Sequence, residues 1–261
     1  MQHLVFQILT RGTVDLATED TCLNAISPWI ESDKTVSVDN APKVGVDQAV
    51  AKRILKTHLP ASLCPFDKEA KYIHVVRHPV SCFASCVDFV HSNLRGFEPD
   101  LDDCLRWFLS PELMWWGTWQ EHLRGWYERG TDGENVLLVR FEDMKAELPK
   151  VIHRVAEFLD VSDLQDAEVE IIARRCGFEY MRTHADLFEM HPPHILQIPN
   201  RFFVSGRTDS ETQLPTFVRE QIIEACGDAF PAGEPLADLY PDCATATSGR
   251  AHEGLVEVGA S

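Results

Sequence analysis

Two alternating patterns along the chain predict an α/β domain with a central parallel sheet flanked by helices. Short runs of β-branched residues alternate with longer stretches at helical spacing, which is typical of parallel strands joined by crossover helices. The 261 residues, of which 44% are apolar, are enough to bury a sizeable core. We expect one folded domain over residues 1–240. Small residues dominate from Gly233 onward, so residues 241–261 are expected to form a flexible tail.

Three strands are expected from the apolar runs, and they cover residues 53–58, 72–76 and 136–141. The second run is nearly continuous in apolar residues, as in a strand that is buried on both faces. Pro79 stands at a favourable first helical position after that strand. Residues 151–159 place apolar side chains on one helical face, so a helix is expected after the third strand.

Two further helical patterns, over residues 101–129, are rich in tryptophan. The tryptophans of this stretch are Trp107, Trp115, Trp116, Trp119 and Trp126. Large aromatic side chains at helical spacing favour a packed helical layer over a cofactor site.

The charge and the cysteines exclude several classes of protein. Lysine and arginine total 24 against 41 aspartates and glutamates, and the net charge of −17 repels nucleic acids and anionic membranes. No apolar run approaches the ~18 residues of a membrane span, and no basic segment leads into an apolar signal core. The eight cysteines show neither a CxxC pair nor the spacing of a zinc site. We expect reduced thiols, no metal and a cytoplasmic location.

One stretch of the chain has the opposite charge. Residues 43–82 contain seven basic and three acidic residues. A focused positive region in an acidic protein indicates a small anionic ligand, because a polymer would meet the negative remainder of the surface.

Polar residues at the carboxyl ends of the expected strands are the candidates for ligand binding in a sheet of this kind. Lys56 and His58 lie two apart on an extended segment, so both point to one side and could present a cation and a base to one ligand. An exposed lysine and a structural histidine are the alternative. Arg77 ends the second strand, ahead of a helix N-terminus and of Ser85, which suits a phosphate.

Three blocks then occur in order: LKTHLP at 55–60, VRHPVSCFAS at 76–85, and FEDMK at 141–145, which leads to VAEFL at 155–159. Together they resemble the cytosolic sulfotransferase family, whose members show KTHLP, an RNPKDVxVS block, and YEDMK followed by an EFLG helix. The resemblance covers about residues 1–230. It implies a fold related to P-loop kinases and the transfer of a sulfuryl group from 3′-phosphoadenosine-5′-phosphosulfate (PAPS) to a hydroxyl or amine, with the bisphosphate PAP as product and no metal.

The resemblance also implies roles for individual residues. His58 falls on the general base, a task that suits a pKa near neutrality, with His74 and His78 as the next candidates. Lys56 falls on the residue that stabilises charge on the departing phosphate oxygen. Arg77 and Ser85 fall on the positions that hold the 3′-phosphate.

The aromatic positions of the family are matched as well. Phe141 and Phe178 fall on the two adenine contacts, where each can stack without a hydroxyl. Phe89 matches an aromatic wall of the acceptor pocket, and Phe83 with the pair Trp115–Trp116 indicates that this pocket is largely apolar. A small lipophilic acceptor such as a phenol or a steroid is therefore expected. The oligomeric state is left open, with a homodimer as one possibility.

Two departures from the family pattern bear on these expectations. The PKSGTTW loop that holds the 5′-phosphosulfate is absent, while MQHLVFQILTR at 1–11 resembles the helix that follows it and SPWIE at 27–31 resembles PWLE. We expect that the chain lacks the first strand and this loop, through a late start, a truncated product or a natural pseudoenzyme. FVSGRTD at 203–209 keeps only Gly206 of the RKGxxGxW block. Arg207, or else Arg201, would replace the missing arginine on the 3′-phosphate, unless the loop is a plain surface turn.

Three functions stay open at this point. A PAPS-dependent sulfotransferase is favoured. The alternatives are a catalytically inactive sulfotransferase-like binding protein and, less well supported, a small-molecule kinase of the P-loop type, which would need a GxxxxGKS or GxxxxGKT loop that the sequence lacks.

Overall fold

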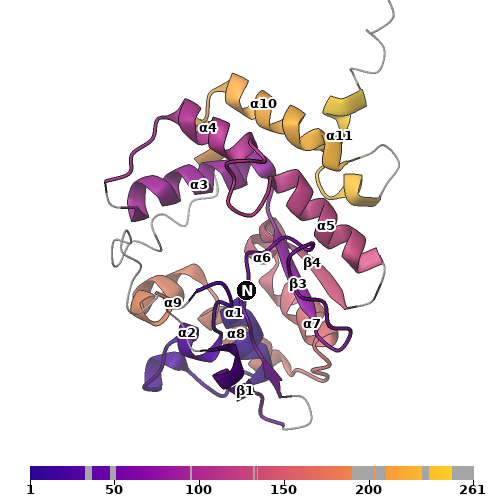
Figure 1. The fold of residues 1–261 in the computed structure, drawn as a ribbon. Coiled ribbons are helices and arrows are strands. Elements are labelled where there is room, and N and C mark those ends of the chain that lie inside the picture. The colour runs from indigo at the N-terminus through magenta and orange to yellow at the C-terminus, as the bar shows by residue number, and fades with distance from the viewer. Residues whose placement is uncertain are drawn as a thin grey trace, which may run out of the picture.

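The computed structural model describes residues 1–32, 37–47, 51–94, 96–131, 133, 135–189, 203, 210–230 and 235–248. At its centre β3 (Tyr72–Val76) pairs in parallel with β4 (Val136–Arg140), and the register runs from Tyr72 opposite Val136 to Val76 opposite Arg140. Figure 1 shows these two strands between an upper and a lower group of helices. The predicted α/β class with a parallel sheet is confirmed, and within the described residues the parallel sheet has these two strands.

Three helices form the crossover between the paired strands. They are α3 (Pro79–Asn93), α4 (Leu101–Leu109) and α5 (Trp119–Thr131). Pro79 occupies the first turn of α3, where its fixed φ favours the helix and its missing N–H leaves no bond unmade. The Asp100 carboxylate caps α4 by accepting a hydrogen bond from the Asp103 backbone N–H at 2.8 Å. Both helical patterns predicted within residues 101–129 are thereby confirmed.

The helices after β4 begin one residue earlier than the sequence pattern indicated. Phe141, expected as the last residue of the third strand, is the first residue of α6 (Phe141–Ala146). The next helix, α7 (Leu148–Phe158), buries Val151, Ile152 and Val155 on one face, as predicted. The remaining helices are α1 (Gln2–Leu9), α2 (Leu23–Ile26), α8 (Asp166–Arg175), α9 (Phe178–Thr183), α10 (Thr216–Cys226) and α11 (Pro241–Ser248).

The strand predicted over residues 53–58 is wrong in extent. The structure has a short antiparallel pair, β1 (Lys43–Val44) with β2 (Lys52–Arg53), and then a single parallel bridge between Trp29 and Lys56. The Lys56 N–H donates to the Pro28 carbonyl and the Ile30 N–H donates to the Lys56 carbonyl, both at 2.9 Å. The ladder ends there because the partner segment turns, with the Ser32 N–H donating to the Trp29 carbonyl.

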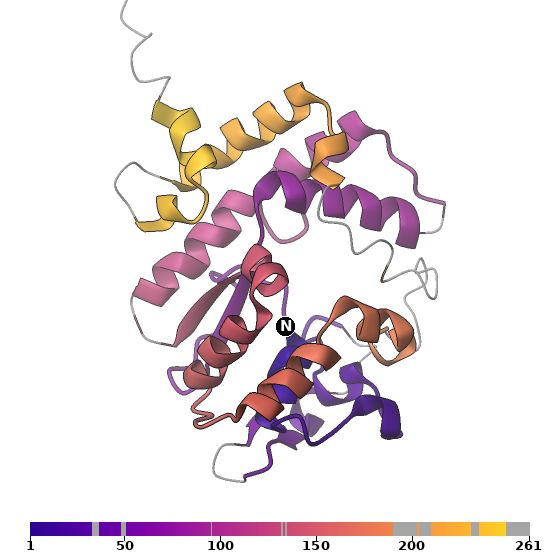
Figure 2. The ribbon, with the colours of Figure 1, turned by 180° about the vertical axis from the view of Figure 1, so that it is seen from behind.

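The apolar core is divided among the layers. The largest cluster joins α1 to α7 and α8, and α1 is buried on every face from His3 to Leu9. A second cluster joins α3, α4 and α10. Seen from behind in Figure 2, the first cluster belongs to the lower group of helices and the second to the upper group, with the parallel strands between them.

The end of the domain differs from the sequence prediction. Residues 241–248, expected as part of the flexible tail, form α11, and its Cys243 is fully buried against Phe230, Leu236 and Tyr240. Residues 249–261 lie outside the described part of the chain.

The tryptophan-rich stretch is packed only in part. Trp126 is buried, whereas Trp115 is 61% exposed. The predicted helical layer therefore accounts for Trp126 but not for Trp115. No helix among the described residues is long and apolar enough to cross a membrane.

His3 is an unusual component of the core. It lies edge-on to the Phe188 ring at 5.0 Å between centroids, and neither imidazole nitrogen makes a hydrogen bond of good geometry within the described residues. Burial, together with the charges of the Met1 amino group and Arg175, lowers its pKa to about 4. The folded protein therefore holds this imidazole in its neutral form.

Replacing His3 by phenylalanine should make the free energy of unfolding less sensitive to acid. The pKa of His3 is about 4 in the folded protein and about 6.5 in an unfolded chain. The histidine therefore does not lower the free energy of unfolding above pH ~6.5, and it lowers this free energy increasingly as the pH drops toward 4. This histidine accounts for a loss on the order of 3 kcal/mol. Urea denaturation at several pH values measures it, with the exposed His153→Asn as control. A pH dependence that is identical in His3→Phe and the wild type would contradict the assignment.

Candidate functional site

Lys56 and His58 lie on the loop that follows the bridge to Trp29, and both contact the Trp29 ring. The Lys56 Nζ lies 5.0 Å from the ring centroid, and the His58 ring meets it edge-on with centroids 4.8 Å apart. Burial lowers the pKa of Lys56, and the carboxylate of Glu31 opposes that shift. The structure thus brings the two predicted catalytic side chains to one aromatic surface.

The imidazole of His58 is enclosed by tryptophan. Trp116 stacks on it with centroids 4.8 Å apart and an interplanar angle of 29°. The His58 Nδ1 is buried and has no hydrogen-bond partner within the described residues. Burial first, and then the charge of Lys56, lower the pKa of His58 to about 4, so the ring is neutral at physiological pH. A neutral imidazole is the form that can accept a proton.

Glu31 fixes the backbone of this loop. Its Oε1 accepts hydrogen bonds from the His58 N–H at 2.6 Å and from the Thr57 hydroxyl at 3.0 Å. The Thr57 oxygen in turn accepts from the Leu59 N–H at 3.0 Å. Because one carboxylate oxygen bonds two successive residues, it restrains the backbone of the loop that carries Lys56 and His58.

Arg77 follows the last residue of β3, and Phe141 follows the last residue of β4. Their adjacent positions place the Arg77 guanidinium carbon 4.7 Å from the centroid of the Phe141 ring. The indole N–H of Trp119 donates to the Arg77 carbonyl at 3.0 Å and holds the strand end. Within the described residues no carboxylate pairs with the Arg77 guanidinium, so its charge is available to an anion.

A second cation lies over a ring one turn further along α6. Lys145 is four residues after Phe141 on that helix, and its Nζ lies 5.8 Å from the centroid of Phe178, the first residue of α9. Two cation–aromatic pairs, Arg77 with Phe141 and Lys145 with Phe178, therefore share α6. Such a row of positive charge and aromatic faces suits a ligand with phosphates and a planar base.

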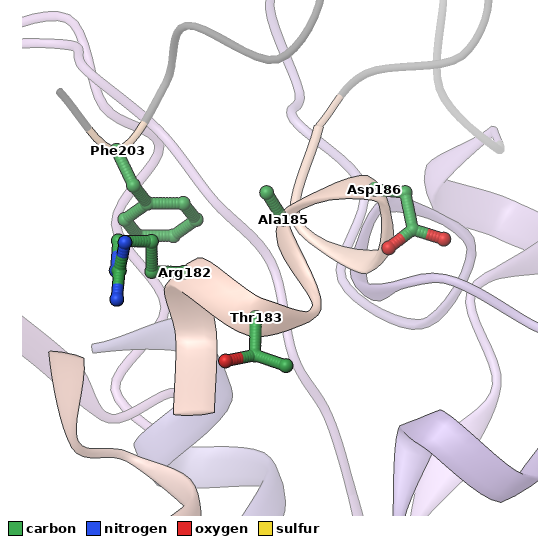
Figure 3. A pocket seen from close by; sticks show the side chains of 5 residues that line it. All are labelled: Arg182, Thr183, Ala185, Asp186 and Phe203. Atoms are coloured by element: carbon green, nitrogen blue, oxygen red, sulfur yellow. The ribbon is translucent and has the colours of Figure 1, made fainter. Parts of the chain in front are cut away.

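A cavity of about 310 Å³ adjoins Phe178 through Phe203, whose ring meets that of Phe178 edge-on at 6.3 Å. Figure 3 shows the five side chains that line it, namely Arg182, Thr183, Ala185, Asp186 and Phe203. A second cavity, of about 500 Å³, lies beyond the end of α7 and includes His153 and Asp160. Of the residues predicted for the site, none that the structure describes lines either cavity.

Several predicted residues lie elsewhere or cannot be placed. Phe83 is fully buried on the inner face of α3, edge-on to Phe108 at 5.3 Å, so the expectation that it lines an acceptor pocket is corrected. Phe89 is 42% exposed on the same helix, and Ser85 is half-buried two turns after Arg77. Gly206 and Arg207 lie outside the described residues.

Sequence reasoning missed Glu31 and Lys145 as parts of the site, and it missed the contact of Trp116 with His58. Glu31 and Lys145 stand within the quoted blocks SPWIE and FEDMK, so a signal was present for them. Trp116 was assigned only to a packed layer and an apolar pocket, since its contact with His58 joins segments that are distant in the sequence.

Comparisons with known proteins identify the family of this chain. Residues 1–209 match the family model described as "Sulfotransferase domain". Sulfotransferase 2A1 of Rattus norvegicus is 30% identical over 165 residues, which cover 60% of this chain and 54% of that protein. Luciferin sulfotransferase of Photinus pyralis is 30% identical over 208 residues, covering 72% and 54%. The chain spans about half the length of these curated relatives.

Solved structures show a similar fold. Mouse sulfotransferase SULT7A1, complexed with PAP, superposes with a TM-score of 0.60 at 24% identity, covering 72% of this chain and 70% of that one. Retinol dehydratase in complex with retinol and PAP gives a TM-score of 0.65 at 17% identity, covering 87% and 76%. At such identities the likeness concerns the arrangement of strands and helices.

Glu31→Ala should lower the free energy of unfolding by about 2 kcal/mol or more, because two hydrogen bonds to a charged oxygen are lost at once. Glu31→Gln keeps an acceptor oxygen and should lose less. Thr57→Val removes one of the two bonds to Glu31, and it also removes the bond that the Leu59 N–H donates to the Thr57 oxygen. Urea denaturation of the four proteins at pH 7 measures the series. An alanine variant as stable as the wild type would show that Glu31 does not hold this loop.

Proposed function

Since the chain belongs to the sulfotransferase domain family, we propose that it transfers a sulfuryl group from PAPS to a hydroxyl or amine of a small acceptor. The observation that carries the proposal is the convergence of Lys56 and His58 on the Trp29 ring. A neutral base and an ammonium group at one surface are the two groups that this transfer needs.

The proposed reaction uses these two side chains in one displacement. His58 accepts the proton of the acceptor O–H or N–H as that atom forms a bond to sulfur. The bond between sulfur and the 5′-phosphate oxygen breaks, and its electron pair stays on the phosphate of PAP. Lys56 offsets the negative charge that develops on this departing oxygen, so its interaction is strongest in the transition state.

The nucleotide is proposed to bind along α3 and α6. Arg77, Ser85 and the free N–H groups at the start of α3 provide a site for the 3′-phosphate. The rings of Phe141 and Phe178 provide faces for the adenine, and Lys145 adds positive charge between them. Support comes from the charge of Arg77, which no carboxylate of the described residues neutralises. Gly206 and Arg207 remain proposed contacts on the strength of the sequence alone.

A lipophilic acceptor is favoured by the aromatic surroundings of His58. Trp116 stacks on the imidazole, and the exposed Trp115 meets Trp116 edge-on at 5.6 Å and Trp107 at 5.4 Å. Apolar aromatic walls next to a buried base suit a phenol or a steroid-like alcohol. Among the similar structures is retinol dehydratase in complex with androsterone. A homodimer and a cytoplasmic location stay predictions.

A binding protein without turnover is the second candidate, and one observation favours it. With a pKa of about 4, His58 is a weaker base than one tuned to neutral pH. Such a protein would bind PAP through Arg77 and Phe141 while leaving an acceptor unsulfated. The two experiments below separate the candidates, because one measures nucleotide binding and the other measures turnover.

Arg77→Ala should weaken the binding of adenosine 3′,5′-bisphosphate by about 2 kcal/mol, because a charge-assisted hydrogen bond to the 3′-phosphate is lost. The wild type should bind 5′-AMP more weakly than the bisphosphate, because 5′-AMP has no 3′-phosphate. Arg77→Ala should leave the affinity for 5′-AMP nearly unchanged. Isothermal titration calorimetry measures both, and Arg106→Ala, at a 70% exposed side chain on α4, is the control. Equal affinities of the wild type for the two nucleotides would refute the 3′-phosphate assignment.

His58→Ala should lower kcat by ~10²–10⁴-fold and leave the affinity for the bisphosphate unchanged, because the imidazole contacts the acceptor. In the free protein the pKa of His58 is about 4. The activity should therefore rise with pH through about 4 and stay level between pH ~5.5 and 7. An unperturbed histidine would instead give a rise centred near pH 6.5. Sulfate transfer to phenol and steroid acceptors measures both, with His153→Ala as control. A wild type that binds the bisphosphate but transfers no sulfate establishes the binding protein instead.

A further inference from the structure

Three chemically different side chains converge where the turn after β3 meets the start of α11. The His78 Nε2 lies 2.9 Å from the Asp242 Oδ2 and 3.7 Å from the Cys243 Sγ. All three ligand atoms lie within 4.8 Å of one another, and no other such group occurs within the described residues. Imidazole, carboxylate and thiolate are the ligands that zinc and similar divalent cations take from proteins.

The scaffold around these side chains holds both elements in place. The His78 backbone N–H donates to the Glu142 Oε1 at 3.0 Å, and the Tyr240 hydroxyl donates to the other oxygen of the same carboxylate at 3.0 Å. The Tyr240 ring lies edge-on to the imidazole, with centroids 5.2 Å apart. Glu142 therefore joins the backbone of one ligand to the residue that precedes α11.

The distances suit a tetrahedral cation. Metal bonds of about 2.0–2.3 Å to nitrogen, oxygen and sulfur place neighbouring ligand atoms of a tetrahedron about 3.3–3.6 Å apart. The observed separations from the His78 Nε2, 2.9 Å and 3.7 Å, lie on either side of that range. The third pair, the Asp242 Oδ2 and the Cys243 Sγ, lies within 4.8 Å, so side-chain rotations that move these atoms by about 1 Å would bring all three onto a tetrahedron.

Burial and charge divide the roles among the ligands. The Cys243 thiol is fully buried. A bound cation takes the place of the thiol proton, which is released to water, and the thiolate and the carboxylate then balance its two charges. The Asp242 side chain is 59% exposed, which leaves a path for the cation and room for water as a fourth ligand.

We propose that His78, Asp242 and Cys243 form a binding site for one divalent cation of the zinc type, with water as the fourth ligand. The cation fastens α11 to the turn between β3 and α3. This inference does not depend on the proposed sulfotransferase activity, since the transfer proposed above uses His58 and Lys56 and none of these three ligands.

Co²⁺ is the probe that reports the ligands directly. Titration of the reduced, untagged protein with Co²⁺ should give a thiolate-to-cobalt charge-transfer band and the intense visible bands of a four-coordinate ion, and one equivalent of Zn²⁺ should remove both. Cys243→Ser should abolish the charge-transfer band. Asp242→Asn, at an exposed position that should not affect folding, should weaken Zn²⁺ binding at least tenfold.

Cys226→Ser is the matched control, because Cys226 is also fully buried in a neighbouring core cluster but is not a ligand. It should leave the cobalt spectrum unchanged. Zn²⁺ should raise the melting temperature of the wild type and of Cys226→Ser, but not that of His78→Ala. A wild type without the charge-transfer band, or a band that Cys226→Ser removes and Cys243→Ser keeps, would overturn the proposal and leave an ordinary histidine–aspartate ion pair.

Discussion

The parallel pairing of β3 with β4 is the constraint on which the rest of the site depends. Because the two strands run in the same direction and Val76 lies opposite Arg140, the next residue of each strand, Arg77 and Phe141, leaves the sheet at the same edge. Their cation–aromatic contact is thus a consequence of register. The same edge starts α3 and α6, so the helix N-terminus with Ser85 and the helix face with Lys145 are placed by the same pairing.

The sequence predicted those parts of the fold that depend on local pattern. The runs at 72–76 and 136–141 are short, apolar and β-branched, and each becomes a strand of the parallel pair within one residue. The run at 53–58 is more polar, and it contributes only Arg53 to β2 and Lys56 to a single bridge, because the partner segment of that bridge turns after Trp29. Strand length is set by the partner as well as by the strand itself.

Side-chain environments were harder to predict because they are set by distant segments. Phe83 and Phe89 are the same type of residue on the same helix, α3. The packing of α4 nevertheless buries Phe83 and leaves Phe89 exposed. The low pKa of His58 depends on its burial among Trp29 and Trp116, which no spacing around the KTH block indicates. The cluster of His78 and Cys243 joins residues 165 positions apart, so a search for local ligand spacing could not find it.

The complete burial of α1 has a consequence for the order in which the protein can assemble. Its partners in the core, α7 and α8, are synthesised well over a hundred residues after it. Until those helices leave the ribosome, α1 can pack only against the members of its cluster that are nearer in the sequence, such as Leu16, Leu23 and Ile26. Contacts of such long sequence separation form slowly, so Phe6, Ile8 and Leu9 are fully withdrawn from water only after α7 and α8 have been synthesised.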